Sequence, residues 1–186
     1  MSAAIGALVI GDEILVGKRK DKHFQFVVAA LAARGLRPAY CEYHGDDPVL
    51  LTAALKRTFA SGDIVFSFGG IGATPDDHTR QCAGDALGAP LAAHPEGERE
   101  LQTRFGAELT PLRLRMVEFP LGAQIIPNPV NRVPGFSLRE HHFVPGFPQM
   151  AWPMVEWVLY NRYRYLVNRD RWAEASIIVY EAGESQ

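Results

Sequence analysis

The stretch GGIGATPDDHT, residues 69–79, decides the fold class because it separates a strand-like run from a segment with helical periodicity. The run before it, DIVFSF, is short and apolar, as is typical of a buried strand. The glycines allow a tight turn and a close approach of the backbone to a ligand. Thr74, Pro75 and Asp77 predict a capping box at the start of a helix over residues 75–87. The stretch is therefore predicted to be a strand–loop–helix junction.

Two further strand–helix pairs precede this junction. An apolar run at residues 3–10 predicts a buried strand, and a pattern of helical periodicity follows it. Residues 36–43 predict a second strand, which Pro38 places at a sheet edge, since proline cannot donate to a ladder. Asp47 followed by Pro48 is a strong helix start. This β-α-β-α-β-α order predicts an α/β fold, a three-layer α/β/α sandwich with a mostly parallel, doubly wound sheet.

The second half of the chain is less regular, and its prolines mark turns between short elements. The predicted elements are a helix at residues 96–108, strands at 124–126, 136–138 and 142–144, and a closing helix at 153–160. We expect one domain over residues 1–160. Residues 161–186 are predicted to be a connector and a lone strand at 176–180, as in a shortened form of a longer protein.

Composition narrows the function classes. The chain is 47% hydrophobic and 22% charged, with a formal net charge of -2, which favours an ordinary globular protein and argues against nucleic acid as a partner. Cys41 and Cys82 have no metal-ligand spacing, and the six histidines form no metal pattern. No apolar stretch approaches the roughly 18 residues that cross a membrane. We expect a cytoplasmic protein with no membrane partner.

The glycine-rich stretch is the strongest candidate site. Free N–H groups at a helix N-terminus favour anions such as phosphate. Asp76 and Asp77 would repel a phosphate unless a cation lay between them, and Mg²⁺ or another divalent ion held by carboxylates and phosphate oxygens resolves this conflict. The alternative is a tight strand-to-helix turn whose acidic residues only complement the helix dipole.

Acidic turns follow the other two strands as well. Asp12 and Glu13 follow the first predicted strand, and Asp46 and Asp47 follow the second. Ligands bind beyond the carboxyl ends of the strands in a doubly wound sheet, so these turns should converge on the glycine-rich stretch. Asp47 is more simply explained as a helix cap, and Asp46 is the freer carboxylate. The predicted metal ligands are Asp12, Asp46, Asp76 and Asp77.

A third group of polar residues lies at residues 127–136 and 145–148. Asn128 could recognise the edge of a base or pterin through its donor and acceptor atoms, and Arg132 could contact phosphate. The alternative is that these residues only form turns between short strands. His141 and His142 are adjacent in a predicted strand, so they should face opposite sides of the sheet.

Five motifs together resemble the CinA-type branch of the MoaB/Mog family, whose domains are often described as molybdopterin-binding. They are GDEIL at residues 11–15, HGDD at 44–47, GGIGATPDDHT at 69–79, NPVNRVPGF at 128–136 and PGFPQM at 145–150. The resemblance covers residues 3–160 and implies an α/β/α sandwich and a homo-oligomer, a dimer or trimer. It implies catalytic roles for Asp46 and Asp77, which match acidic residues important in the Mog relatives.

The resemblance also implies what the site binds. Mog relatives join adenylate to molybdopterin, and CinA-type relatives are associated with metal-dependent cleavage of ADP-ribose. The ligand-binding residues implied here are Gly69, Gly70, Gly72, Ala73, Thr74, Asn128, Pro145 and Gly146. We expect a nucleotide or pterin ligand and hydrolysis of an ADP-ribose-like pyrophosphate. The alternatives are a molybdopterin-binding or adenylyl-transferring protein of molybdenum-cofactor biosynthesis, and a binding module without turnover.

The chain departs from the usual pattern of this branch at several positions. It has His23 where Asn is usual and Ala73 where Pro is usual. Residues 131–133 are Asn-Arg-Val, where Gly-Thr-Ala is usual. Met150 stands where Glu is usual. Loss of that Glu could remove a contact to metal or ribose, which makes binding a safer expectation than catalysis.

Overall fold

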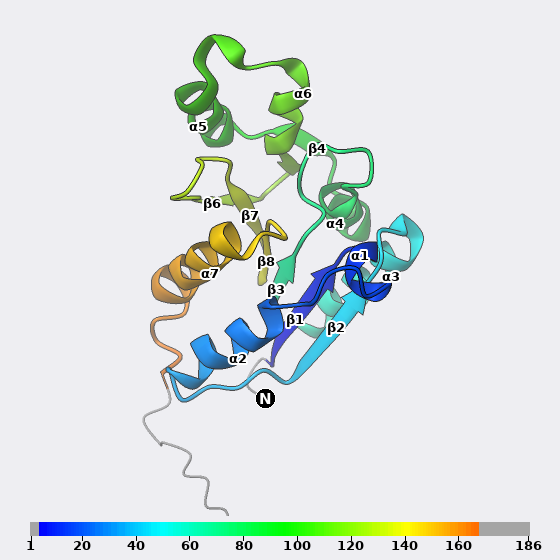
Figure 1. The fold of residues 1–186 in the computed structure, drawn as a ribbon, viewed down its shortest axis with the longest axis vertical. Coiled ribbons are helices and arrows are strands. Elements are labelled where there is room, and N and C mark those ends of the chain that lie inside the picture. Colours follow the sequence, from blue (N-terminus) through cyan, green and yellow to red (C-terminus); the bar gives the residue numbers. More distant parts are fainter. Residues whose placement is uncertain (1–3, 168–186) are drawn as a thin grey trace, which may run out of the picture.

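The structure, a computed structural model, describes residues 4–167 (Figure 1). The predicted strand at residues 176–180 and most of the predicted connector lie outside the described residues. Within residues 4–167, no helix combines the length and the apolar character that crossing a membrane requires.

A six-stranded sheet forms the centre of the molecule, in the order β2-β1-β3-β8-β7-β6. Its strands are β1 (Ile5–Ile10), β2 (Tyr40–His44), β3 (Ile64–Phe68), β6 (Gln124–Ile126), β7 (Gly135–Leu138) and β8 (His141–Val144). The strands β2, β1, β3 and β8 run parallel, and β7 is antiparallel to both of its neighbours. The predicted mostly parallel, doubly wound sheet is confirmed, with chain reversals only in its second half.

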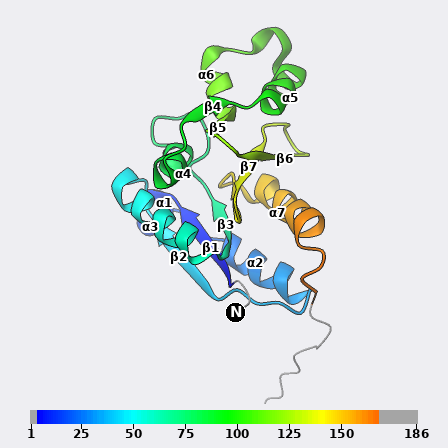
Figure 2. The ribbon, with the colours of Figure 1, turned by 180° about the vertical axis from the view of Figure 1, so that it is seen from behind.

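Helices cover both faces of this sheet, which confirms the three-layer sandwich (Figures 1 and 2). Side chains alternate along β1, so Ala7 and Val9 pack toward α2 (His23–Ala32) and α7 (Pro148–Arg162). Leu8 and Ile10 pack on the other side with α3 (Pro48–Ser61) and α4 (Thr79–Leu87). Two separate apolar cores therefore fix the sheet between the helix layers.

The two adjacent histidines of β8 confirm this alternation. His141 contacts the Thr58 hydroxyl of α3 at 2.8 Å, whereas His142 contacts the Tyr163 hydroxyl, just after α7, at 2.6 Å. Both rings are buried, and burial lowers the pKa of each, that of His141 to about 4. They are core histidines on opposite faces, as the sequence predicted.

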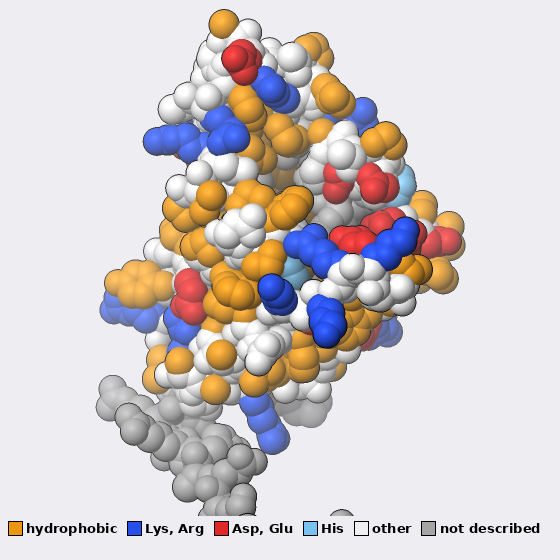
Figure 3. Space-filling model, in the orientation of Figure 1, with side chains coloured by type: hydrophobic (Ala, Val, Ile, Leu, Met, Phe, Trp, Pro, Cys, Tyr) orange, Lys and Arg blue, Asp and Glu red, His pale blue; other side chains and the backbone are white. Residues whose placement is uncertain are grey.

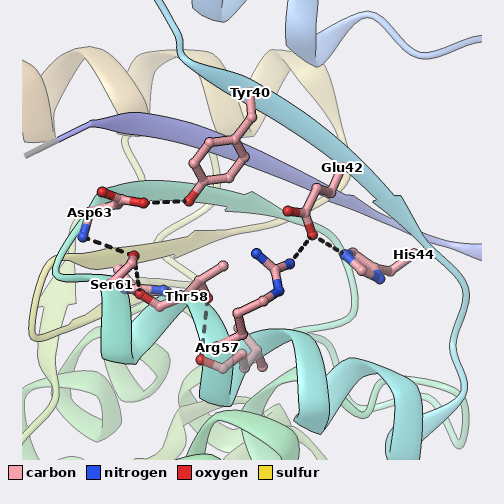
Figure 4. A network of polar contacts seen from close by, with 9 residues as sticks. Tyr40, Glu42, His44, Arg57, Thr58, Ser61 and Asp63 are labelled. Carbon is pink, nitrogen blue, oxygen red and sulfur yellow. Dashed lines mark hydrogen bonds and ion pairs between the residues drawn. The ribbon is translucent and has the colours of Figure 1, made fainter.

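Besides Cys41, which packs against the core, the edge strand β2 is held by polar side-chain contacts (Figure 4). Glu42 accepts hydrogen bonds from Arg57 of α3 at 2.5 Å and contacts His44 at 3.0 Å. The Tyr40 hydroxyl donates to Asp63 at 3.3 Å, across to the start of β3. The strand begins at Tyr40, later than predicted, although the Ala39 N–H already donates to the Ile5 carbonyl of β1 at 2.7 Å.

A small lobe between α4 and β6 was not predicted in full (Figure 1). Its predicted part is the helix α5 (Pro95–Phe105) with the 3-10 turn η1 (Gly106–Glu108). The additional elements are α6 (Pro111–Leu114), η2 (Arg115–Val117) and a two-stranded sheet of β4 (Leu91–Ala93) and β5 (Glu118–Pro120). The sequence analysis left the segments of β4 and β5 unassigned.

Candidate functional site

A cavity of about 420 Å³ opens beyond the carboxyl ends of β1 and β3. This is the edge where doubly wound sheets bind ligands, and the volume suits a small molecule. The structure brings together most of the predicted site residues around it: Asp46, Gly69, Gly70, Gly72, Ala73, Thr74, Asp76, Asp77, Asn128, Pro145 and Gly146. Asp12 does not line the cavity, but it contacts Asp46, which does.

Gly69 and Gly70 carry the loop past its neighbours more closely than a side chain would permit. Their φ angles are 104° and 67°, in the region that favours glycine. A Cβ atom at Gly69 would lie 2.3 Å from the carbonyl oxygen of Ile10, and one at Gly70 would lie 2.2 Å from Thr79 Oγ1. These glycines are therefore required to build the junction, whatever the loop binds.

The helix after this loop, α4, begins at Thr79, so the prediction that it begins at Pro75 is wrong. Thr79 is tied to the end of β3, because its N–H donates to the Gly70 carbonyl at 3.0 Å. Its hydroxyl donates to the Gly69 carbonyl at 3.1 Å. The start of the helix is set by this tertiary contact, and no helix N-terminus lies at Pro75 to attract an anion.

Thr74 and Asp77 instead close a separate turn before the helix. The Thr74 N–H donates to Asp77 Oδ2 at 2.8 Å, and the Asp77 N–H donates to the Thr74 carbonyl at 3.0 Å. The Thr74 hydroxyl also donates to the Asp77 carboxylate. Asp77 therefore fixes the shape of the turn that lines the cavity, and it does so without the predicted helical capping box.

Arg80, which the sequence analysis did not select, holds the glycine loop from behind. Its side chain is buried, and its guanidinium donates to the carbonyl oxygens of Gly72 at 2.6 Å and Glu118 at 3.1 Å. A third hydrogen bond reaches the Arg115 carbonyl. Burial lowers its pKa, as expected for a desolvated cation. Arg80 thereby fastens the loop to the lobe at η2 and β5.

Acidic residues converge at the cavity, around Asp46. The Asp12 N–H donates to Asp46 Oδ2 at 3.0 Å, and the Asp46 N–H donates to Asp12 Oδ1 at 3.2 Å. Partial burial, together with the negative charges of Asp12, Glu13 and Asp76, raises the pKa of Asp46. Asp47 is not part of this group, because its side chain caps α3 through the N–H groups of residues 49 and 50.

This arrangement fits a divalent cation that is shared with a ligand better than an all-protein metal site. In residues 4–167, no three Asp, Glu, His or Cys side chains are grouped closely enough to hold a metal ion by themselves. Mg²⁺, however, binds through one or two carboxylates together with phosphate oxygens and water. The crowded negative charge at Asp46 would be offset by such a cation.

The asparagines on the opposite wall use their side chains within their own loop. Asn128 is buried; its Oδ1 accepts from the Val130 N–H at 3.0 Å, and its Nδ2 donates to the Val133 carbonyl at 3.0 Å. Asn131 donates to the sulfur of Met150 at 3.0 Å. Met150 is the residue that stands where the resemblance led us to expect Glu. These contacts agree with the structural alternative stated above for this motif.

Arg132 does not lie at the cavity. Its guanidinium contacts Glu100 of α5 at 3.0 Å, and its backbone has a φ of 59°. Arg132 is therefore not placed to contact a phosphate in the cavity.

Arg19 does line the cavity, although the sequence analysis had not selected it. Its guanidinium donates to the Gly146 carbonyl at 3.1 Å, lies 3.7 Å from the Glu13 carboxylate and stacks 5.4 Å from the centre of the Phe147 ring. The usable signal was its place in Lys18-Arg19-Lys20, soon after the acidic turn that follows β1. Among the described residues that line this cavity, Arg19 is the basic one, and a guanidinium is well suited to bind phosphate.

The fold and the cavity define the class: a doubly wound α/β domain that can bind a small molecule at the carboxyl edge of its sheet. Comparison with known families agrees, since residues 6–165 match the family described as "Probable molybdopterin binding domain". The chain therefore belongs to this family, the MoaB/Mog family.

The curated relatives are CinA-like. The chain is 35% identical over 155 residues to a CinA-like protein of Anaeromyxobacter sp. (strain Fw109-5), an alignment that covers 80% of this chain and 38% of the relative. It is 31% identical over 156 residues to a putative competence-damage inducible protein of Alkaliphilus metalliredigens, again covering 80% and 38%. The chain thus spans about two fifths of the length of these relatives.

Solved structures support the fold. A CinA protein of unknown function from Thermoplasma acidophilum superposes with a TM-score of 0.77 at 24% identity, covering 89% of this chain and 99% of that one. The molybdopterin biosynthesis enzyme MoaB from Thermus gives a TM-score of 0.56 at 19% identity, covering 89% and 94%. At these identities, the likeness shows a shared fold.

Proposed function

We propose that this chain binds a phosphate-bearing nucleotide or pterin between the glycine loop and Asp46, and that it hydrolyses an ADP-ribose-like pyrophosphate with a divalent metal ion. The observation that carries the proposal is the convergence of Asp12, Glu13 and Asp76 on Asp46 at the cavity that the glycine loop also lines. Of these carboxylates only Glu13 has an ion pair among the described residues, with Arg19. Crowded carboxylates destabilise the free protein, so their grouping is better explained by function than by folding.

The reaction requires one water molecule. Its oxygen attacks one phosphorus of the pyrophosphate, the P–O bond to the bridging oxygen breaks, and AMP and ribose 5-phosphate leave. A divalent ion, when bound, supplies positive charge for the developing phosphate oxygens and lowers the pKa of water. Asp12, Asp76 and Asp77 are the candidates to hold it. Asp46, whose pKa is raised, lines the cavity and is our candidate to accept the proton of the attacking water.

The test is incubation of the protein with ADP-ribose and Mg²⁺ or Co²⁺, with AMP and ribose 5-phosphate separated by chromatography. We expect turnover that requires the metal ion and disappears in Asp46→Ala. Asp85→Ala is the matched control, since Asp85 lies on α4 and contacts Gln81 outside the cavity. Nucleotide binding without any turnover would leave only the binding function and refute the hydrolase.

The second candidate is binding of molybdopterin or transfer of adenylate to it. The family match favours this alternative, because the family is described as molybdopterin-binding. Fluorescent pterin that co-purifies with the protein would support it over the hydrolase. The third candidate is a binding module without turnover. Met150 favours it, because this residue lines the cavity at the position where a Glu carboxylate was expected.

We also propose a homo-oligomer, to be measured by light scattering.

A further inference from the structure

The side chains that line the cavity do not by themselves explain how it would hold a phosphate. Most of the charged ones are acidic, and Arg19, already in contact with a carboxylate, is the one basic side chain among the described lining residues. The space-filling view shows acidic side chains, with basic ones beside them, on the face that carries α1 (Asp12–Leu15) (Figure 3). A phosphate would therefore depend on backbone donors as well as on a bound cation.

Thr79 and Arg80 hold three carbonyl groups of the glycine loop. The Thr79 hydroxyl and N–H donate to the carbonyl oxygens of Gly69 and Gly70, at 3.1 Å and 3.0 Å. The Arg80 guanidinium donates to the Gly72 carbonyl oxygen at 2.6 Å. Both residues are buried and neither lines the cavity, whereas the three glycines do. The loop therefore lies between these two residues and the cavity, and its three bonded carbonyls point to the buried side.

The same contacts decide where the N–H groups of the loop point. The peptide bonds of the described residues are trans, so each carbonyl points opposite to the N–H of the following residue. Because the carbonyls of Gly69 and Gly72 point to the buried side, the N–H groups of Gly70 and Ala73 point toward the cavity. Both residues line the cavity and are partly exposed, and neither N–H has an acceptor among the described residues. Free N–H groups gathered in a turn form an anion-binding concavity.

Arg80 also brings a positive charge to the back of this turn. Its hydrogen bonds go to carbonyl oxygens, those of Gly72, Arg115 and Glu118. Within residues 4–167, no carboxylate lies at ion-pair distance from its guanidinium. The negative charges of Glu118 and Asp77 act on it only from further away. A guanidinium stays charged in proteins, and a charge surrounded by protein is felt over a longer distance than one in water.

We propose that Arg80 is a positioning residue for the phosphate of the ligand: it holds the Gly72 carbonyl so that the Ala73 N–H faces the cavity, and its charge favours an anion there. Thr79 positions the Gly70 N–H in the same way, without a charge. This inference rests on the proposed nucleotide-binding function and deepens it. The selectivity of the loop for phosphate then depends on a buried residue that never touches the ligand.

The first test compares AMP with adenosine, which lacks the phosphate, by calorimetry in the presence of Mg²⁺. Arg80→Met removes the charge and the hydrogen bonds, and Arg80→Lys keeps the charge. We expect the affinity for AMP to fall about tenfold in Arg80→Met and by less in Arg80→Lys. The affinity for adenosine should change less than about twofold in both variants. A merely structural role of Arg80 would weaken the two ligands alike.

Arg34→Met is the matched control. Arg34 is a partly buried arginine that donates to the Ala30 carbonyl at 2.8 Å and to Glu156 at 2.7 Å, and it does not line the cavity. Its replacement removes the same kind of side chain from another part of the fold. The affinities of Arg34→Met for AMP and for adenosine should equal those of the wild type.

A second readout reports on the N–H groups themselves. Inorganic phosphate, titrated into the wild-type protein, should shift the amide NMR signals of Gly70 and Ala73. It should shift that of Thr74 less, because the Thr74 N–H already donates to Asp77. In Arg80→Met, the shift at Ala73 should fall more than the shift at Gly70, which Thr79 positions.

The outcomes separate this inference from the proposed function. If the wild-type protein bound AMP no more tightly than adenosine, the phosphate site, and with it the proposed function, would be refuted. If the wild type preferred AMP and Arg80→Met kept that preference, Arg80 would have only a structural role and the inference would be overturned. Should Arg80→Met not fold, Arg80→Lys and the wild-type titration decide: phosphate that left the signals of Gly70 and Ala73 unshifted would overturn the inference.

Discussion

The two walls of the cavity use similar polar residues in opposite ways. On the wall of Asp46 and the glycine loop, with Asp12 behind Asp46, carboxylates lie close together and the pKa of Asp46 is raised. On the wall of Asn128 and Asn131, the side-chain amides are hydrogen-bonded within their own loop and to Met150. The first wall holds unfavourable negative charge that a bound divalent cation could relieve, whereas the polar groups of the second wall already have hydrogen-bond partners. Function is therefore expected from the first wall and stability from the second.

The largest effect is expected from Gly72→Val on the first wall. A Cβ atom at this position would lie 2.5 Å from Asp77 Oδ2, so the substitution must displace the carboxylate and the turn it closes. We expect binding of AMP to fall at least a hundredfold and hydrolysis of ADP-ribose to disappear. Calorimetry and the hydrolysis assay measure both effects. Equal AMP affinity in the variant would show that the loop does not hold the ligand.

Asp77→Ala should cost at least a hundredfold in turnover, with a smaller loss of stability. The side chain makes two hydrogen bonds to Thr74, in an exposed turn, whose removal costs about 1 kcal/mol in the free energy of unfolding. Turnover is measured at a temperature where the variant is fully folded by circular dichroism. Near-normal activity would remove Asp77 from the catalytic assignment, and Asp85→Ala again serves as the control.

Asn128→Ala should give the reverse pattern on the second wall. The substitution leaves the part-buried Val133 carbonyl without its donor and the Val130 N–H without its acceptor, which should cost about 1–3 kcal/mol. Urea denaturation measures this loss. The affinity of the folded protein for AMP should change less than threefold. A large loss of affinity with little loss of stability would mean that Asn128 contacts the ligand and that the comparison of the walls is wrong.

The smallest effect is expected from Asp46→Asn in the metal-free protein. Because the pKa of Asp46 is raised in the folded state, that state binds the proton more tightly than the unfolded chain does. The stability of the wild-type protein therefore falls as the pH rises from the pKa of the unfolded chain through the raised pKa of the folded state. The Asp46→Asn variant has no carboxylate at this position, so its stability should not fall for this reason. At neutral pH we expect the free energy of unfolding of the variant to exceed that of the wild type by about 0.2–1 kcal/mol. Thermal unfolding measures this difference. Lower stability of the variant at neutral pH would contradict the charge-crowding argument.

Local signals predicted the first half of the fold well. Asp47 accepts from the N–H groups of residues 49 and 50, as its place before Pro48 predicted, and Gly62 ends the same helix in the left-handed conformation that glycine favours. These features depend on residues within a few positions of one another, so the sequence alone contains them.

Features that depend on distant contacts were missed. The start of α4 is set by the bonds of Thr79 to Gly69 and Gly70, which no capping pattern contains. Arg19 reaches the site because Gly146, at the far end of β8, accepts its hydrogen bond. Whether Asn128 is free or already satisfied depends likewise on how its loop folds. Sequence motifs located the edge of the sheet, but they could not show which polar groups remain available there.

The most direct test of the central claim is a crystal structure of the protein soaked with ADP-ribose and Ca²⁺, a divalent ion chosen to slow turnover. We predict density for the diphosphate against Gly70, Gly72 and Thr74, with the ion between its oxygens and the carboxylates around Asp46. A nucleotide bound on the Asn128 wall, with the glycine loop unoccupied and no ion near Asp46, would contradict the account.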